Sequence, residues 1–287
     1  MRTTILASLL ISAQLAVFGQ GAAAQAAPIG PKFEVASIKL AAPDEHFMFG
    51  VRLMPGGRIN AMNVTLKLLI ETAYGLQDFQ LFGGPGWIET ARYNIEGKPD
   101  SPVGPNEWKE MLKNLLADRF QLVFHRETKE LPVYALVLAN KDDKPRPGMV
   151  ESKEGSCAAR DPSKPLAPPG PGQPPFCGNV LGGASILTAT AATLGDIAPM
   201  LSRIVGRKVI DKTGLTGKYD ITLKYTPDEN QLAMMAPPGV PPPPAPADAS
   251  SPSLFTALQE QLGLKLEPQK APVEIFVIDR AAKPSDN

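Results

Sequence analysis

The sequence has few of the residues that build reactive sites. It contains two cysteines and two histidines, and these residues do not stand at metal-ligand spacing, so we expect no metal centre. It has no G-x-S-x-G motif, and no nucleophile, base and orienting group can be identified together. We therefore assign no catalytic residue, and we expect no cofactor.

An excess of charge of one sign is also absent. The chain has 29 Lys and Arg residues against 29 Asp and Glu residues, and it has no basic block. Nucleic acids and anionic membranes attract proteins through clustered Lys and Arg. The sequence therefore predicts neither of them as a partner.

Long apolar segments are missing, and the chain begins with a short one. Within residues 1–24, Arg2 precedes an uncharged apolar run from Ile5 to Phe18, and small residues follow at Ala22 and Ala24. This pattern is typical of a secretory signal peptide and is too short for a membrane span. We predict a periplasmic or secreted protein that does not insert into a membrane after signal cleavage.

Cys157 and Cys177 both lie in a proline-rich segment, residues 141–178. In an oxidising compartment a lone pair of cysteines is most simply a disulfide, although two free thiols remain an alternative. Closing this loop should stabilise the fold by roughly 3 kcal/mol in the entropic model. A second proline-rich stretch spans residues 226–252, and neither stretch shows hydrophobic periodicity. We interpret the first as a linker and the second as an insertion.

Two similar stretches, "TARYNIEGKPD" (90–100) and "TGKYDITLKYTPD" (216–228), place Tyr93 and Tyr219 at an offset of 126 residues. The elements around them follow the same order. The sequence therefore predicts an α+β protein made of two duplicated β-α-β-β-α-β modules with small mixed sheets, residues 31–140 and 179–287, joined by the linker. We expect each tyrosine to lie half in and half out of a core.

Local signals place the elements of each module. The stretch 50–64 reads as a hairpin around a Pro-Gly-Gly turn, and 120–140 and 264–280 also read as hairpins. Apolar residues at helical spacing predict four helices, of which the first ends at Gly75 and the third near Gly206; Pro199 inside the third could kink it. Their expected N-caps are Thr65, Asn106, Thr193 and Ser253.

Several stretches carry a resemblance to a known family: "FEVASIK" (33–39), residues 111–140, "VIDKTGLTGKYDITLKYTPD" (209–228), and the segment from Ser253 onward. Over the mature chain the protein resembles the "Solibacter" duplicated exported proteins of Acidobacteria, a family without an established activity. Each half is also weakly similar to the short N-terminal domain of secretins and TonB-dependent receptors, with "SLFTALQEQLGLKL" (253–266) the closest stretch. That resemblance implies a protein-binding module.

Three motifs have a functional and a structural interpretation. "DKTG" (211–214) matches the start of a phosphorylation motif, but a turn explains it better because the rest of that machinery is missing. "GGPGW" (83–87) lacks the Lys and Ser/Thr of a phosphate loop and predicts a tight turn, with Trp87 as a possible binding anchor. His125, beside Arg126 and Glu127, indicates a solvated strand face.

The function predicted from these observations is non-catalytic. We expect a binding or adaptor protein of the cell envelope that contacts an envelope protein, because small sheets offer open edges for strand addition. A sensory role is one form that this function could take. Trp87, Tyr93 and Tyr219 are the candidate binding surface. The alternative is a hydrolase or small-ligand binder with its site in the cleft between the two modules.

Overall fold

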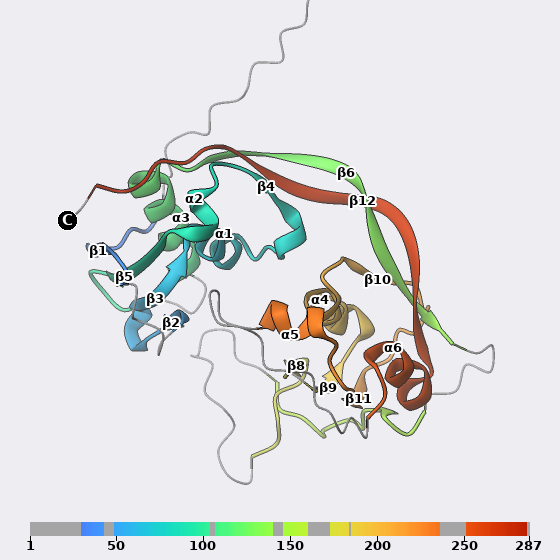
Figure 1. Ribbon diagram of the computed structural model, residues 1–287. Coiled ribbons are helices and arrows are strands. Elements are labelled where there is room, and N and C mark those ends of the chain that lie inside the picture. The colour runs from blue at the N-terminus through green and yellow to red at the C-terminus, as the bar shows by residue number, and fades with distance from the viewer. Residues whose placement is uncertain are drawn as a thin grey trace, which may run out of the picture.

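The computed structural model describes residues 30–42, 49–103, 107–139, 146–159, 173–183, 185–235 and 251–285. The expected signal peptide and the expected cap Asn106 lie outside these ranges. The fold is mixed α+β, with three four-stranded sheets and helices packed between them. Figure 1 shows a long two-stranded ribbon arching over the helices, with two smaller sheets on their other side.

The first small sheet is antiparallel throughout. Its strand order is β1 (Val35–Leu40), β5 (Arg92–Lys98), β3 (Ile59–Thr65) and β2 (Gly50–Leu53). The expected hairpin over 50–64 is confirmed, with a short helical turn η1 (Pro55–Gly57) between β2 and β3. Helices α1 (Leu66–Tyr74) and α3 (Glu107–Phe120) bury their apolar sides against this sheet and form the first core.

The second small sheet is also antiparallel. Its strand order is β7 (Met149–Glu151), β11 (Tyr219–Lys224), β9 (Ile186–Ala192) and β8 (Asn179–Gly182). Helix α4 (Leu194–Val205), helix α6 (Leu254–Ala257) and the π-turn η3 (Leu258–Leu262) pack on it as the second core. The expected linker is therefore not wholly outside the sheets: it contains strand β7, whose Met149 is buried in the second core. The expected insertion likewise contains a helix, α5 (Glu229–Met235).

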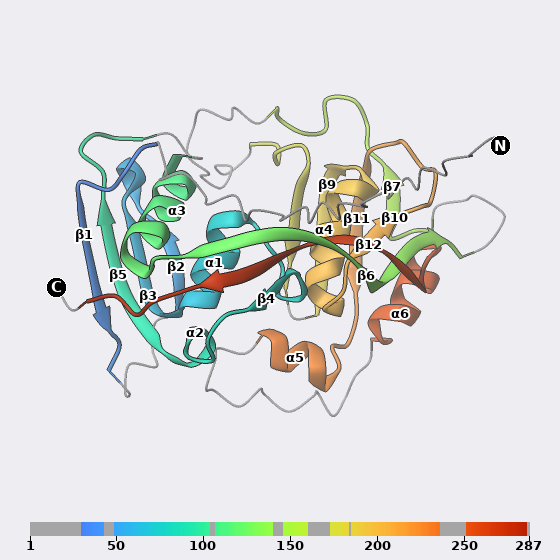
Figure 2. The same cartoon turned by 90° about the horizontal axis from the view of Figure 1, so that it is seen from above.

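The third sheet joins the two halves and is the mixed one. Its order is β10 (Val209–Asp211), β6 (Val123–Leu138), β12 (Leu264–Arg280) and β4 (Leu81–Gly83). β6 and β12 run antiparallel along almost their whole length, while β10 and β4 add parallel strands at opposite edges. Figure 2 shows this β6–β12 ribbon from above as it passes from one half to the other.

The expectation that 120–140 and 264–280 are hairpins is therefore wrong. Each stretch is one continuous strand that pairs with the other. Neither stretch has Gly or Asn near its midpoint to reverse the chain. The backbone hydrogen bonds of such a long strand can be made just as well by a strand that is distant in sequence. As a result β6 begins on the first core with Phe124 and ends on the second with Leu136, and β12 runs the opposite way.

Prolines sit near the middle of this ribbon. Pro132 pairs with Lys270 and Pro272 pairs with Glu130. A proline has no amide hydrogen to give to a ladder, so it is tolerated where one side of its strand is unpaired. β10 joins β6 only from Tyr134 onward and β4 joins β12 only from Phe276 onward, so both prolines lie where the ribbon has two strands.

The helix ends follow the sequence closely. The side chains of Thr65, Thr193 and Ser253 accept hydrogen bonds from the backbone amides of the third following residue, so all three expected caps are confirmed. Gly75 and Gly206 end α1 and α4 with φ values of 68° and 64°, in the left-handed region that favours glycine. Helix α4 continues through Pro199 to Val205.

A bulge in each small sheet explains the repeated tyrosine stretch. Asn63 in β3 and Ala191 in β9 have positive φ values of 51° and 44°, and the strand register shifts beside each of them. The amide of Asn63 donates to Asn94 Oδ1 at 2.8 Å, and the amide of Ala191 donates to Asp220 Oδ1 at 2.8 Å. The polar residue after each tyrosine thus satisfies a bulged amide that the ladder leaves free.

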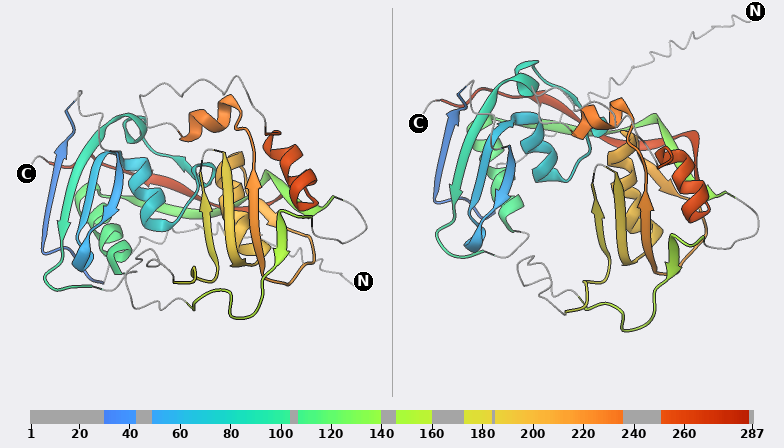
Figure 3. Two further views of the ribbon diagram at one scale, coloured as in Figure 1. Left: turned by 90° about the horizontal axis from the view of Figure 1, so that it is seen from below. Right: turned by 60° about the horizontal axis from the view of Figure 1, so that its bottom comes forward.

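The two small sheets lie side by side below the ribbon, each with one edge strand turned toward the other sheet. Figure 3 shows β2 and β8 as these inner edges, whereas β1 and β7 form the outer edges. Among the described residues, no helix combines the length and the apolar character needed to cross a membrane.

Candidate functional site

The three residues expected to form a binding surface do not come together. Tyr93 is 1% exposed in the first core, where its ring makes an edge contact with Phe120, and Tyr219 is 7% exposed in the second core. Trp87, at the start of α2 (Trp87–Thr90), is half-buried against the first core. The expectation of half-exposed tyrosines is wrong, because each tyrosine side chain is buried in the core on which its sheet packs. A binding role for these residues stays a prediction.

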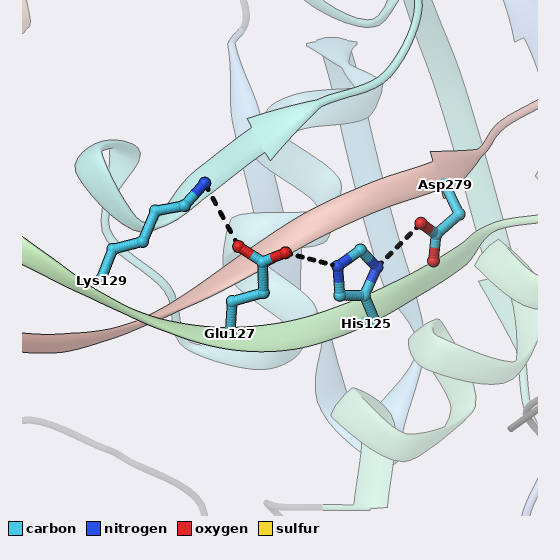
Figure 4. A network of polar contacts seen from close by, with 4 residues as sticks. All are labelled: His125, Glu127, Lys129 and Asp279. Atoms are coloured by element: carbon cyan, nitrogen blue, oxygen red, sulfur yellow. Dashed lines mark hydrogen bonds and ion pairs between the residues drawn. The ribbon is translucent and has the colours of Figure 1, made fainter. Parts of the chain in front are cut away.

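Instead, a chain of polar side chains lies on the ribbon (Figure 4). His125 on β6 bonds Asp279 of β12 at 2.8 Å through Nδ1 and Glu127 at 3.0 Å through Nε2, and Lys129 Nζ lies 3.2 Å from Glu127. The hydrogen bonds to Glu127 and Asp279 raise the pKa of His125 above its ordinary value. His125 is 47% exposed, which confirms the expected solvated face.

These four polar side chains do not form a recognised catalytic arrangement. Both ring nitrogens of His125 are taken by carboxylates, and in the part of the chain that the structure describes no hydroxyl or thiol is bonded to the ring. A nucleophilic triad needs such a group within hydrogen-bond reach of the base. The arrangement can hold a proton and tie the two ribbon strands together.

A second charged cluster lies on α1. Lys67 Nζ contacts Asp78 Oδ1 at 2.5 Å and Glu89 Oε1 at 3.1 Å. One helical turn further, Glu71 has a buried Oε1 without a hydrogen-bond partner among the described residues. Burial, and then the nearby charge of Asp78, raise the pKa of Glu71 to about 7. Glu71 is thus a carboxyl group that is half protonated near neutral pH.

The "DKTG" motif is a turn, as expected. Asp211 Oδ1 accepts hydrogen bonds from the amide of Thr213 at 2.9 Å and from its hydroxyl at 2.7 Å. Gly214 follows with a φ of 74°, which glycine adopts readily. The carboxylate of Asp211 is used to shape the backbone after β10.

Exposed apolar side chains gather at the sheet edges. Six of the large hydrophobic residues that are at least a third exposed lie on edge strands: Val35 and Leu40 on β1, Leu53 on β2, Phe82 on β4, Val150 on β7 and Leu181 on β8. Inner strands carry such residues only at their first positions, Val123 and Ile186. Edge strands also have unpaired backbone amide and carbonyl groups, so they combine apolar side chains with hydrogen-bonding capacity. The sequence predicts open sheet edges in general, but no local pattern singles out these residues.

Comparison with known protein families gives a match over most of the chain. The sequence of residues 67–281 matches a family described as "Protein of unknown function (DUF3738)". No curated protein and no solved structure matches the chain.

Proposed function

The chain belongs to this family of proteins of unknown function, and from that premise we propose that it is an exported, non-catalytic adaptor that binds an envelope protein by strand addition. The observation that carries the proposal is that edge strands of all three sheets carry exposed apolar side chains. Strand addition uses the free backbone groups for affinity and alternate side chains for specificity. A sensory role would use the same contact.

Strand β8 is the edge best suited to this contact. Four of the six edge strands carry a charged residue that discourages pairing: Lys39 in β1, Arg52 in β2, Glu151 in β7 and Asp211 in β10. The remaining two edge strands are β4 and β8. A charge also lies near β4, because Lys129 Nζ is 5.6 Å from the centre of the Phe82 ring. In β8 Leu181 is 59% exposed, and the strand contains neither charge nor proline.

The proposal includes an internal duplication. The two small sheets have matching strand orders when β1, β5, β3 and β2 are equated with β7, β11, β9 and β8. The bulges at Asn63 and Ala191, their acceptors Asn94 and Asp220, and the caps that follow the bulges occupy equivalent places. These shared details support descent of both halves from one unit.

The register of the ribbon supports the same duplication. Val133 pairs with Gln269, and Lys129 pairs with Val273. If Val133 is equated with Val273, the first pair maps onto the second, and the pair formed by Leu131 and Ala271 maps onto itself. An approximate two-fold relation centred on that pair would generate this register, as expected for a fused pair of equal units.

Export rests on two further observations. The structure joins Cys157 to Cys177 in a disulfide, as the sequence predicts, and disulfides persist in oxidising compartments. The first residues have the composition of a signal peptide. The similarity of 253–266 to the secretin and TonB-receptor module supports protein binding in the envelope.

The proposal is tested by affinity capture from envelope extract with the mature chain and with Leu181→Lys. A lysine at this exposed position should leave the fold intact but discourage strand addition at β8. Val150→Lys, on the outer edge strand β7 of the same sheet, is the matched control because Val150 is also more than half exposed. We expect a discrete partner to be recovered with the parent chain and with Val150→Lys, at a level at least about tenfold above that with Leu181→Lys.

Capture of the same partner by all three proteins would reject β8 as the contact. Failure to capture any partner, with correctly folded bait, would count against the adaptor function itself. Trp87→Ala is a less direct probe, because Trp87 packs on the first core and its loss would disturb the fold.

The alternative of a small-ligand site between the halves is favoured by one observation, a cavity in the middle of the ribbon whose lining comes from both halves. A hydrolase reaction has no comparable support in the residues described above.

A further inference from the structure

The cavity lies where the two halves meet. The first half contributes Phe79, Phe82 and Leu131, and the second half contributes Arg207, Lys208 and Val273. Phe79 belongs to η2 (Asp78–Gln80), just before β4, and Arg207 and Lys208 lie just before β10. The residues that precede these two short edge strands therefore come from opposite halves and meet at the centre of the ribbon.

The apolar part of the cavity is fixed by packing. Val273 is fully buried, and Leu131 and Phe79 pack with it in a small cluster separate from the two main cores. The cavity holds about 170 Å³. An apolar cavity of roughly 150 Å³ is large enough for benzene, so this space fits a six-membered ring or a branched chain of similar size.

The polar part of the cavity carries positive charge. Arg207 and Lys208 are the charged residues of its lining, and no carboxylate lies among the lining residues. Neither side chain has a carboxylate partner in the portion of the chain that the structure describes. The guanidinium of Arg207 instead lies 5.6 Å from the centre of the Tyr134 ring, which leaves its donors available.

The backbone holds these two cations beside the apolar surface. The carbonyl of Lys208 accepts a hydrogen bond from the amide of Tyr134 at 2.9 Å, which fixes the approach to β10. A third cation near the cavity, Lys129, is already paired with Glu127. The free positive charge beside the rings is therefore that of Arg207 and Lys208.

We propose that this cavity binds a small organic acid, namely an apolar ring or branched chain that carries one carboxylate. The apolar part would lie against Leu131 and Val273 near the phenyl rings, and the carboxylate would contact Arg207 and Lys208. An arginine can hold a carboxylate through two parallel hydrogen bonds. A free acid and the C-terminal residue of a polypeptide present this same chemistry. The site is separate from β8, so it goes beyond the adaptor function.

The test is calorimetric titration of the mature chain with phenylacetate and with phenylacetamide, which has the same shape without the charge. We expect the acid to bind at least about tenfold more tightly than the amide. An acetylated tripeptide ending in phenylalanine, with a free or an amidated C-terminus, distinguishes the two sources. Tighter binding of the free-terminus peptide than of phenylacetate assigns the site to polypeptide C-termini, and the reverse order assigns it to free acids.

Charge and shape are then separated with variants. Replacing both cations, by Arg207→Gln and Lys208→Gln together, should weaken the acid about tenfold or more and leave the amide unchanged. Arg52→Gln with Lys98→Gln, two exposed cations on the first sheet, is the matched control and should have no effect. Leu131→Phe, which fills the cavity, should weaken acid and amide alike. Thermal melts confirm that each variant is folded.

Three results would overturn the proposal. Acid and amide could bind equally, the double Gln variant could bind the acid as well as the parent chain does, or neither ligand nor peptide could bind at roughly millimolar concentration. None of these results would bear on capture of a partner through β8, so failure of this site and failure of the adaptor function can be told apart.

Discussion

The two halves of the molecule share the features that shape the backbone and differ in the side chains they expose. Both have a bulge with a polar acceptor beside the core tyrosine, a threonine cap and a glycine helix end. On the helix that follows, the first half has Lys67 and Glu71, whereas the corresponding positions of α4 are Gly195 and Pro199. The disulfide lies in the chain between β7 and β8 of the second small sheet and has no counterpart in the first half.

The comparison separates structural from functional candidates. Residues found at equivalent places in both halves, such as Asn94 and Asp220, are accounted for by the bulge. Residues found in one half alone need another explanation, and they include the charged cluster on α1 and the two cations near β10. The central cavity depends on this difference, because the first half supplies phenyl rings and the second supplies positive charge.

The largest expected effect comes from Glu71, which has no counterpart in α4. Its pKa is about 7 in the folded protein, against 4.5 for the ordinary carboxyl group. Well below pH 4.5 the group is protonated in both the folded and the unfolded protein, so it does not change the free energy of unfolding. As the pH rises toward 7 only the unfolded chain releases the proton, so stability falls, by about 3 kcal/mol at most. Glu71→Gln should remove this loss.

Urea unfolding at pH 4, 6 and 8.5 measures this effect. Glu71→Gln should match the parent chain at pH 4 and exceed it progressively at higher pH. Glu96→Gln, an exposed residue of β5, is the control and should follow the parent chain. Equal stabilities of Glu71→Gln and the parent chain at pH 8.5 would contradict the buried, destabilising carboxylate.

The next effect compares the two bulge acceptors. Asn94→Ala and Asp220→Ala each leave a bulged amide without its acceptor, which should cost about 1–3 kcal/mol. Asp220 should cost more, because it also accepts a hydrogen bond from Ser152 Oγ at 2.8 Å and so holds the chain beside β7. Asp220→Asn keeps an acceptor oxygen and should retain most of the stability. Denaturant midpoints of the three variants measure these losses of stability. Alanine variants as stable as the parent chain would show that the bulges do not need these side chains.

These acceptors mark the limit of what the sequence predicts. Thr65, Thr193 and Ser253 are identifiable as caps because capping depends on neighbours within one turn, and the Asp211 turn is local in the same way. Asn94 and Asp220 act across strands on residues about 30 positions away. Their signal is a polar residue directly after each repeated tyrosine, which the repeat alone could have revealed.

The long ribbon shows the same limit for strands. The residues of β6 and β12 have strand character that the sequence predicts, but nothing local states that each strand pairs with the other, about 140 residues away at its centre. Because the ribbon brings Phe79 and Arg207 to opposite sides of its middle, the cavity could not be predicted either. Sites made by distant chain segments depend on topology rather than on motifs.

A smaller effect compares two buried tyrosines. The Tyr93 hydroxyl is buried without a hydrogen-bond partner among the described residues, whereas the Tyr225 hydroxyl donates to the carbonyl of Gly183 at 3.1 Å. Tyr93→Phe should therefore be neutral or slightly stabilising, and Tyr225→Phe should cost about 1 kcal/mol. Thermal unfolding of both variants tests the difference, and the opposite order would place a hydrogen bond on Tyr93.

The smallest effect concerns His125. Its pKa is raised by Glu127 and Asp279, so its contribution to stability is present below the pKa of the unfolded chain, 6.5, and is lost as the pH rises through the higher folded value. Asp279→Asn should bring the pKa of His125 back toward 6.5. Proton NMR of the histidine ring measures both values, and an unchanged pKa in Asp279→Asn would remove Asp279 as a cause.

Hydrogen exchange of the captured complex is the most direct test of the binding mechanism. With the partner bound, the amides of residues 179–182 in β8 should exchange more slowly, because an added strand would take up backbone groups that are free in the isolated protein. The corresponding inner edge β2, with Arg52 at its centre, should be unchanged. Protection of β2 or of the outer edges without protection of β8, or a complex with no change at any edge strand, would contradict strand addition at β8.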